Sequence, residues 1–183
     1  TLWFQLSKDA TNPEISLEVW SDSTATQVFL PTSAGLANCY HVHVHDLMPG
    51  RDYYTILTSN NQAISDTLAI STQALWQYRT DPPEFKIALG SCSYINEPQF
   101  DRPGKPYGGE YGIFKTVARE APDAMFWLGD NVYLREADLG SIHGYIHRYN
   151  HTRSTPEIQE LLSSGVHYAI WDDHDFGPDN SDG

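Results

Sequence analysis

Acidic side chains and histidines gather directly after two short apolar stretches of this 183-residue chain. Residues 129–133 read Gly-Asp-Asn-Val-Tyr after the apolar run 124–128, and residues 172–175 read Asp-Asp-His-Asp after the apolar run 166–171. Hard cations favour carboxylate oxygens, and imidazole binds transition metals. Neighbouring carboxylates also raise one another's pKa unless a cation neutralises them. These residue types therefore predict a metal site or acid–base chemistry, with Asp130 as the first candidate.

A third reactive side chain, Cys92, follows another apolar run at residues 86–89. Between the apolar runs, residues 111–120 and 139–150 have helical spacing, and residues 155–156, Thr-Pro, are typical of a helix start with Thr as the N-cap. The order strand, helix, strand, helices, strand predicts three neighbouring parallel strands. Their carboxyl ends meet at one edge, where ligands bind in open α/β sheets. The middle run is expected to be the central strand, buried on both faces.

The first part of the chain has a different pattern, in which short alternating stretches are separated by turn residues. Stretches at 15–20, 40–44 and 54–57 alternate apolar and polar residues, as the strands of a β-sandwich do. Residues 47–53, Leu-Met-Pro-Gly-Arg-Asp-Tyr, resemble the Leu-x-Pro-Gly-x-x-Tyr corner of fibronectin type III-like domains. In that corner the Tyr hydroxyl bonds to the backbone at the turn.

Two consecutive prolines, Pro82 and Pro83, separate these two patterns. Proline cannot donate a backbone hydrogen bond, so the pair disfavours both helix and internal strand. We therefore predict an α+β chain of two domains. Residues 1–81 are expected to form a fibronectin-III/Ig-like β-sandwich, and residues 82–183 are expected to form an α/β domain.

The composition limits the partners of the chain. It has 24 Asp and Glu against 11 Lys and Arg, a formal net charge of −13. Proteins bind nucleic acid by neutralising phosphates with basic residues, so no nucleic-acid-binding surface is expected. No apolar run approaches the roughly 20 residues of a transmembrane helix. The two cysteines, Cys39 and Cys92, fall in different predicted domains, so no disulfide framework is expected.

Three motifs resemble the signatures of PhoD-like alkaline phosphatases, which belong to the calcineurin-like metallophosphoesterase superfamily. They are Gly-Ser-Cys at 90–92, Gly-Asp-Asn-Val-Tyr at 129–133 and Trp-Asp-Asp-His-Asp at 171–175. The resemblance implies that residues 82–183 are the first, βαβαβ half of an α/β metallophosphoesterase domain. It also implies a preceding β-domain and an extracytoplasmic enzyme. The implied activity is hydrolysis of small-molecule or lipid phosphate esters, monoesters or diesters, by a metal-activated water.

The resemblance further implies a metal ligand at each matching position. Cys92, Asp130 and Tyr133 would bind a ferric-type ion, and Asp130 would bridge to a second ion. The metals implied are Fe³⁺ and Ca²⁺, with Zn²⁺ or Mn²⁺ as alternatives.

The motif around the third strand end implies the remaining roles. Asp173 stands where related phosphoesterases have the Asn of a Gly-Asn-His motif, and it is expected to bind metal. His174 stands at the His of that motif and would stabilise or protonate the leaving group, a catalytic role that it would share with Asp130. A downstream ligand is expected at Asn180, with Asp179 as the second choice.

The later motifs of the family, which bring a further Asp and His residues, do not occur in this sequence. The chain is therefore expected to be a fragment or truncated form that hydrolyses p-nitrophenyl phosphate poorly by itself. An alternative function is a non-catalytic secreted binding protein with a degenerate phosphoesterase domain. A third is a hydrolase with Ser91 as nucleophile, although the Gly-x-Ser-x-Gly elbow is missing.

Two further sets of histidines have regular spacing, one along a predicted strand and one along a predicted helix. They are His41, His43 and His45 in the first set, and His143, His147 and His151 in the second. The strand set could chelate zinc, but no Cys or acid is placed to complete a tetrahedron, so a partly exposed sheet face is favoured. The helix set is expected to be a packing or solvated stripe, with a role near the substrate as the alternative.

Overall fold

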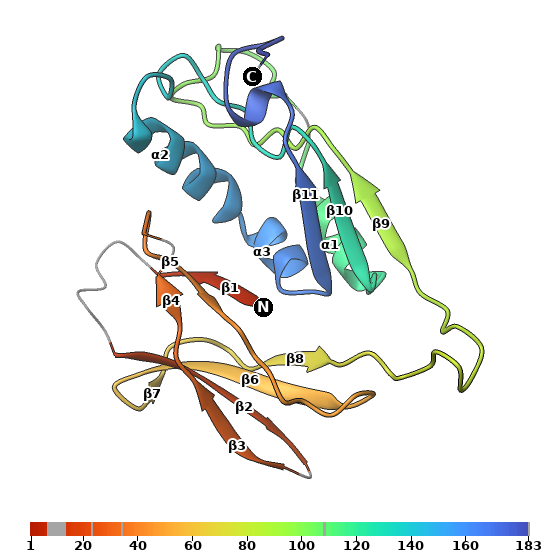
Figure 1. Ribbon diagram of the computed structural model, residues 1–183. Helices are drawn as coiled ribbons and strands as arrows, with labels where there is room; N and C mark the ends of the chain where they lie inside the picture. Colours follow the sequence, from red (N-terminus) through yellow and green to blue (C-terminus); the bar gives the residue numbers. More distant parts are fainter. Residues whose placement is uncertain (7–13, 23, 34, 108, 183) are drawn as a thin grey trace. The chain divides into compact units, whose positions relative to one another are not determined.

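The computed structural model describes residues 1–6, 14–22, 24–33, 35–107 and 109–182. The chain divides into two compact units, Thr1–Pro83 and Glu84–Gly183 (Figure 1). The division falls at the second of the two prolines, two residues after the predicted boundary. Within the described residues, no helix is long and apolar enough to cross a membrane.

The first unit is built from antiparallel strands, which form two sheets in the part of the unit that the structure describes. One sheet has the order β1-β5-β4, with bounds Leu2–Gln5, Cys39–Val42 and Thr32–Ser33. The other has the order β3-β2-β6-β7, with β8 also paired to β6, and its bounds are Thr24–Phe29, Ile15–Ser21, Asp52–Ser59, Gln62–Ala63 and Leu68–Ser71.

Alternate residues of these strands form the core of the first unit. Leu17 and Val19 of β2 are buried with Val42 of β5 and Tyr53 of β6. The Tyr53 hydroxyl accepts a hydrogen bond from the backbone N–H of Met48 at 2.8 Å. This is the bond that the tyrosine-corner resemblance implies, and it ties the turn before β6 to the core.

Within its described residues, the second unit contains three parallel strands in the order β11-β10-β9. Their bounds are Ile87–Gly90 for β9, Ala124–Leu128 for β10 and Val166–Ile170 for β11. Three helices connect them, α1 (Gly112–Arg119) before β10, and α2 (Ile142–Arg153) and α3 (Pro156–Leu162) before β11. The prediction of three parallel neighbours with residues 124–128 in the centre is confirmed.

The prediction that β10 is buried on both faces is wrong. Met125 and Trp127 are buried in a cluster with Leu161 of α3, and residues of α1 pack against it. Leu128, by contrast, is 45% exposed. Successive side chains of a strand point to opposite faces, and only the face toward α1 and α3 is covered. The other face exposes apolar side chains, namely Ile87, Leu89, Leu128, Val166, Tyr168 and Ile170.

The helix starts differ in detail from the predictions. α3 begins at Pro156 with Thr155 as its N-cap residue, as predicted, but the Thr155 hydroxyl makes no capping hydrogen bond. Instead, the helix starts where the extended backbone of Thr155 meets Pro156, whose ring fixes φ near the helical value. α2 begins three residues after the predicted start, because Ser141 caps it by accepting from the Gly144 N–H.

One histidine of the α2 stripe, His147, contacts the loop between β9 and α1, whereas His143 is exposed. His147 Nε2 lies 3.1 Å from a carboxylate oxygen of Glu97. The neighbouring Arg148 is fully buried and pairs with both Glu97 and Asp138, at 2.8 and 2.7 Å. Breaking such a buried pair leaves an uncompensated charge, so this network holds α2 against the loops at the strand ends.

Candidate metal centre

The chain turns sharply at the carboxyl ends of β9 and β10. Asp130 and Cys92 both have positive φ, of 52° and 59°. Residues other than glycine rarely adopt this left-handed conformation, and it occurs mostly where the surrounding structure enforces it, often at functional sites. Gly129 has φ of 95°, and a Cβ added to it would lie 2.6 Å from the Asp172 Cβ. The glycine therefore lets the loops after β10 and β11 approach each other closely.

The segment after β11 forms a single 3-10 turn, η1 (Asp173–Asp175), whose last residue faces inward. Asp175 is 3% exposed. Its Oδ1 accepts from the backbone N–H groups of Asn131 and Val132, at 2.8 and 3.1 Å. Its Oδ2 accepts from the Asn131 side-chain amide at 3.1 Å and from the Asp172 N–H at 3.0 Å. One buried carboxylate thus joins the loop after β10 to the turn after β11.

Helix α2 holds the same turn from its other side. The Tyr149 hydroxyl donates to the Asp175 carbonyl at 3.0 Å, and the Tyr145 hydroxyl donates to the Phe176 carbonyl at 2.6 Å. These bonds satisfy backbone carbonyls that the short turn leaves without partners. The candidate side chains after β11 are therefore positioned by α2 as well as by the sheet.

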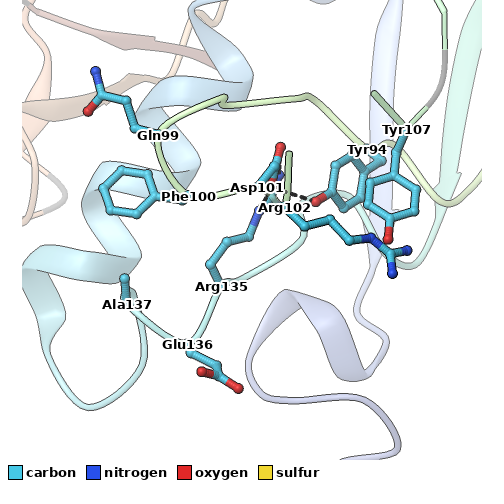
Figure 2. A pocket seen from close by; sticks show the side chains of 9 residues that line it. All are labelled: Tyr94, Gln99, Phe100, Asp101, Arg102, Tyr107, Arg135, Glu136 and Ala137. Carbon is cyan, nitrogen blue, oxygen red and sulfur yellow. Dashed lines mark hydrogen bonds and ion pairs between the residues drawn. The ribbon is translucent and has the colours of Figure 1, made fainter. Parts of the chain in front are cut away.

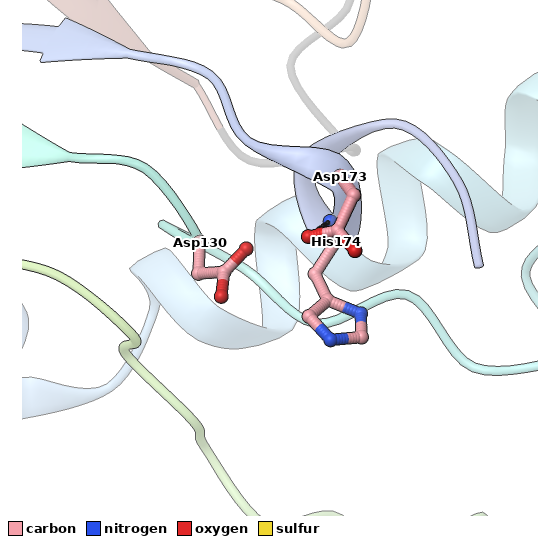
Figure 3. A group of neighbouring side chains, drawn as sticks. All are labelled: Asp130, Asp173 and His174. Carbon is pink, nitrogen blue, oxygen red and sulfur yellow. Dashed lines mark hydrogen bonds between the residues drawn. The ribbon is translucent and has the colours of Figure 1, made fainter. Parts of the chain in front are cut away.

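Three candidate side chains come together across these loops. Potential ligand atoms of Asp130, Asp173 and His174 all lie within 4.8 Å of one another. Figure 3 shows the Asp130 carboxylate, on the loop after β10, directed toward the other two side chains on the turn after β11. Asp130 is 8% exposed, and its Oδ1 is buried without a hydrogen-bond partner among the described residues.

Two more candidates converge on the other oxygen of Asp130. The Tyr133 hydroxyl donates to Asp130 Oδ2 at 3.0 Å, and the Cys92 thiol lies 3.6 Å from the same oxygen. Burial raises the pKa of Tyr133 above its usual range, and hydrogen bonds with Cys92 and Asp130 raise it further. Without a cation the phenol therefore stays protonated.

The two remaining predicted ligands, Asp173 and Asn180, contact each other through a backbone hydrogen bond. Asp173 accepts a short hydrogen bond from the backbone N–H of Asn180, and this bond lowers the pKa of that carboxyl. The Asn180 side-chain amide donates to Asp179 at 2.8 Å. An Asp179 carboxylate oxygen lies 3.6 Å from His174 Nε2. Asn180 thus contacts the group through its backbone, and a ligand role for its side chain stays a prediction.

The sequence predicted one acidic cluster at residues 172–175, but the structure divides it. Asp173 and His174 face Asp130, whereas Asp175 is buried below them and Asp172 caps the turn by accepting from the Asp173 N–H at 3.0 Å. The structural role of Asp175 was missed. The spacing of a capping box, an N-cap acceptor followed three residues later by an acid, could have indicated it.

The donor set fits a metal ion. Carboxylates, an imidazole, a thiol and a phenol lie around Asp130. Ions bind these atoms at roughly 2.0–2.6 Å, so donors within 4.8 Å of one another can share one ion. The buried Oδ1 of Asp130 has no hydrogen-bond donor among the described residues, which is unfavourable for a carboxylate. A bound cation would compensate for the missing donor.

Solved structures of other proteins share the fold of this chain. One, described as the structure of PhoD, aligns with 94% of this chain and 36% of its own, with a TM-score of 0.69 and 21% identity. A purple acid phosphatase, PPD1, isolated from seeds of yellow lupin (Lupinus luteus), aligns with 87% of this chain and 30% of its own, with a TM-score of 0.59 and 14% identity. The chain thus spans about a third of the length of each.

These similarities define the class of fold, a mixed α/β arrangement with antiparallel sheets and one parallel sheet, as in two phosphatases. No protein-family profile and no curated protein sequence matches the chain.

Proposed function

We propose that this chain carries part of the active site of a PhoD-like metallophosphoesterase that hydrolyses phosphate esters. The main support is that Asp130, Asp173 and His174 come together from two neighbouring strand ends. One oxygen of Asp130 is buried there without a hydrogen-bond partner among the described residues. The shared fold with PhoD and a purple acid phosphatase supports the proposal. In the same proposal, the first unit is a fibronectin-III/Ig-like sandwich, supported by its Tyr53 corner.

Asp130 has neighbours suited to metal binding on two sides, which supports a bridging role. We assign Cys92 and Tyr133, which meet its Oδ2, to one cation, and Asp173 to a second. Thiolate and phenolate favour a transition metal such as Fe³⁺, Zn²⁺ or Mn²⁺ for the first position. Oxygen ligands suit Ca²⁺ at the second, with Asn180 as a further ligand there.

The chain's own residues would orient the reaction. When bound, the cations lower the pKa of a coordinated water and neutralise charge on the phosphoryl oxygens. His174 is 22% exposed at its side chain, and its ring packs 4.4 Å from the Tyr133 ring. We assign to this imidazole the stabilisation or protonation of the leaving-group oxygen. Asp175 and the tyrosines of α2 hold the turn that carries it.

The charge of the protein bears on how a phosphate ester would bind. A net charge of −13 disfavours the approach of a phosphate group, and bound cations would offset this repulsion at the site. We propose small-molecule or lipid phosphate esters as substrates, and an extracytoplasmic location.

Metal binding tests the proposal directly. We expect the purified chain to bind Fe³⁺ with a visible tyrosinate charge-transfer band, measured by absorption and elemental analysis. Tyr133→Phe is expected to abolish the band, and Asp130→Asn to abolish metal binding. Tyr168→Phe, which changes an exposed tyrosine on the sheet, is the matched control.

A colourless, metal-free protein after exposure to iron, calcium, zinc and manganese would contradict the proposal. That result would favour the alternative of a non-catalytic binding protein, because the fold would remain without the ions that its acidic edge requires.

A further inference from the structure

A cavity of about 600 Å³ lies between the loop after β9 and the loop after β10. In Figure 2 the rings of Tyr94 and Tyr107 lie together on one side of it, and Phe100 lies on the opposite side. The lining residues are Tyr94, Gln99, Phe100, Asp101, Arg102, Tyr107, Arg135, Glu136 and Ala137.

One wall of the cavity packs against Tyr133 of the candidate metal centre. The Tyr94 ring lies 5.0 Å from the Tyr133 ring, whose hydroxyl donates to Asp130. Arg135 donates a short hydrogen bond to the Tyr133 carbonyl and stacks on Tyr94, with its guanidinium carbon 4.2 Å from the ring centroid. A wall of the cavity and the candidate ligand Tyr133 therefore share one packed network.

One arginine and one carboxylate of the lining neutralise each other. Arg135 and Asp101 form an ion pair at 2.9 Å, with side chains about one-tenth exposed. Tyr94 donates to Asp101 at 2.7 Å, and its own pKa is raised to about 12, first by burial and then by this bond. The tyrosine is therefore a neutral ring held by a fixed carboxylate, which makes it a rigid wall of the cavity.

The lining also offers exposed aromatic rings. Tyr107 and Phe100 are 40% and 44% exposed. The Arg102 guanidinium lies 4.8 Å from the Tyr107 ring centroid and makes no ion pair with a carboxylate among the described residues. Guanidinium planes and tyrosine rings both stack on planar aromatic groups. The lining carries two arginines and two carboxylates, so its net charge is zero. It therefore would not select a ligand with a second anionic group besides the phosphate.

We propose that this cavity binds the organic group of the phosphate ester, and that the group it takes is a planar aromatic one, as in an aryl or nucleoside ester. The proposal rests on the proposed function, because it places the phosphate of the same ligand at Asp130 and His174. Tyr107 and Arg102 would form the stacking surface, and Tyr94 the wall toward the metal centre.

The test compares two non-hydrolysable ligands, phenylphosphonate and methylphosphonate, by calorimetric titration in the presence of Mn²⁺. Aromatic stacking in proteins changes binding by about tenfold per ring. We therefore expect phenylphosphonate to bind about tenfold more tightly than methylphosphonate. The ratio of the two affinities should fall toward unity in Tyr107→Ala. Tyr78→Ala, which removes a fully exposed tyrosine from the other unit, should keep the ratio and is the matched control.

The outcomes separate this inference from the proposed function. Equal binding of both phosphonates would overturn the aromatic subsite and leave the phosphoesterase proposal standing. Tighter binding of phenylphosphonate that survives Tyr107→Ala would also overturn it, since the ring would then be bound elsewhere. Failure of both ligands to bind in the presence of metal would overturn the proposed function together with the subsite. A preference for a ligand with a second phosphate over phenylphosphonate would replace the aromatic class by an anionic one.

Discussion

Replacing Asp175 should damage the candidate metal centre although this side chain does not face it. The carboxylate is 3% exposed and accepts four hydrogen bonds from residues on two loops, at 2.8 to 3.1 Å. Asp175→Ala leaves these buried donors without an acceptor, which costs about 1–3 kcal/mol for each group that water cannot reach. Because the loops can relax, we expect a total loss of about 3–5 kcal/mol in the free energy of unfolding.

The isosteric change Asp175→Asn separates charge from shape. One oxygen can still accept from the N–H groups of Asn131 and Val132, but the new amide group faces two donors in place of the second oxygen. We expect a loss of about 2 kcal/mol in stability. We also expect metal affinity to fall by about 10–100-fold, as is typical when a residue that orients ligands is changed.

Chemical denaturation followed by tryptophan fluorescence measures the first quantity, and metal titration of the folded variant measures the second. Asp66→Asn, at an exposed aspartate, is the matched control and should change neither quantity. An Asp175→Asn protein with the stability and metal affinity of the parent chain would refute the reasoning, because the four hydrogen bonds would then not position the two loops.

Three further predictions concern stability. Gly129→Ala puts a Cβ 2.6 Å from the Asp172 Cβ at a φ of 95°, so it should lower the free energy of unfolding by about 2–4 kcal/mol; an unchanged denaturation midpoint would contradict the close approach. His167 accepts from the Trp127 indole at 3.1 Å, and burial lowers its pKa from 6.5, so the folded state favours the neutral ring. Stability should therefore be full above pH 6.5 and fall as the pH drops through the folded pKa, and His167→Gln should flatten this dependence in denaturation curves measured across that range. Burial alone raises the pKa of Asp101, but its hydrogen bonds outweigh this and lower it from 3.8 to about 2, so Asp101→Asn should lose about 2 kcal/mol near neutral pH. That deficit should shrink as the pH falls from 3.8 toward 2, and a constant deficit would indicate lost packing instead.

One face of the parallel sheet exposes apolar side chains. Its six apolar side chains, Ile87 and Leu128 among them, are 44% or more exposed, whereas strands in parallel sheets are ordinarily covered on both faces. The chain also spans only 36% of PhoD. We expect poor turnover of p-nitrophenyl phosphate by the chain alone, and a phosphatase assay on the purified 183 residues with added metal ions tests this.

The order of elements could be predicted from the sequence because local signals are strong in this chain. Short apolar runs that end in polar turns predicted β9, β10 and β11, and the alternation of helices with strands predicted a parallel sheet. The sequence pattern could not show whether one or both faces of β10 are buried. An apolar run reads the same whether one face or both faces are covered, and only the position of the helices decides which residues lose contact with water.

The sequence by itself determined which chemistry is available at each strand end: a thiol after β9, an aspartate and a tyrosine after β10, and carboxylates with an imidazole after β11. Parallel pairing places these ends at one edge, which follows from connectivity alone. Only the tertiary structure decided that Asp173 and His174 face Asp130 while Asp175 turns inward. The physical reason is that a carboxylate can bind a cation or accept backbone hydrogen bonds, and the choice depends on which donors the folded chain brings to it.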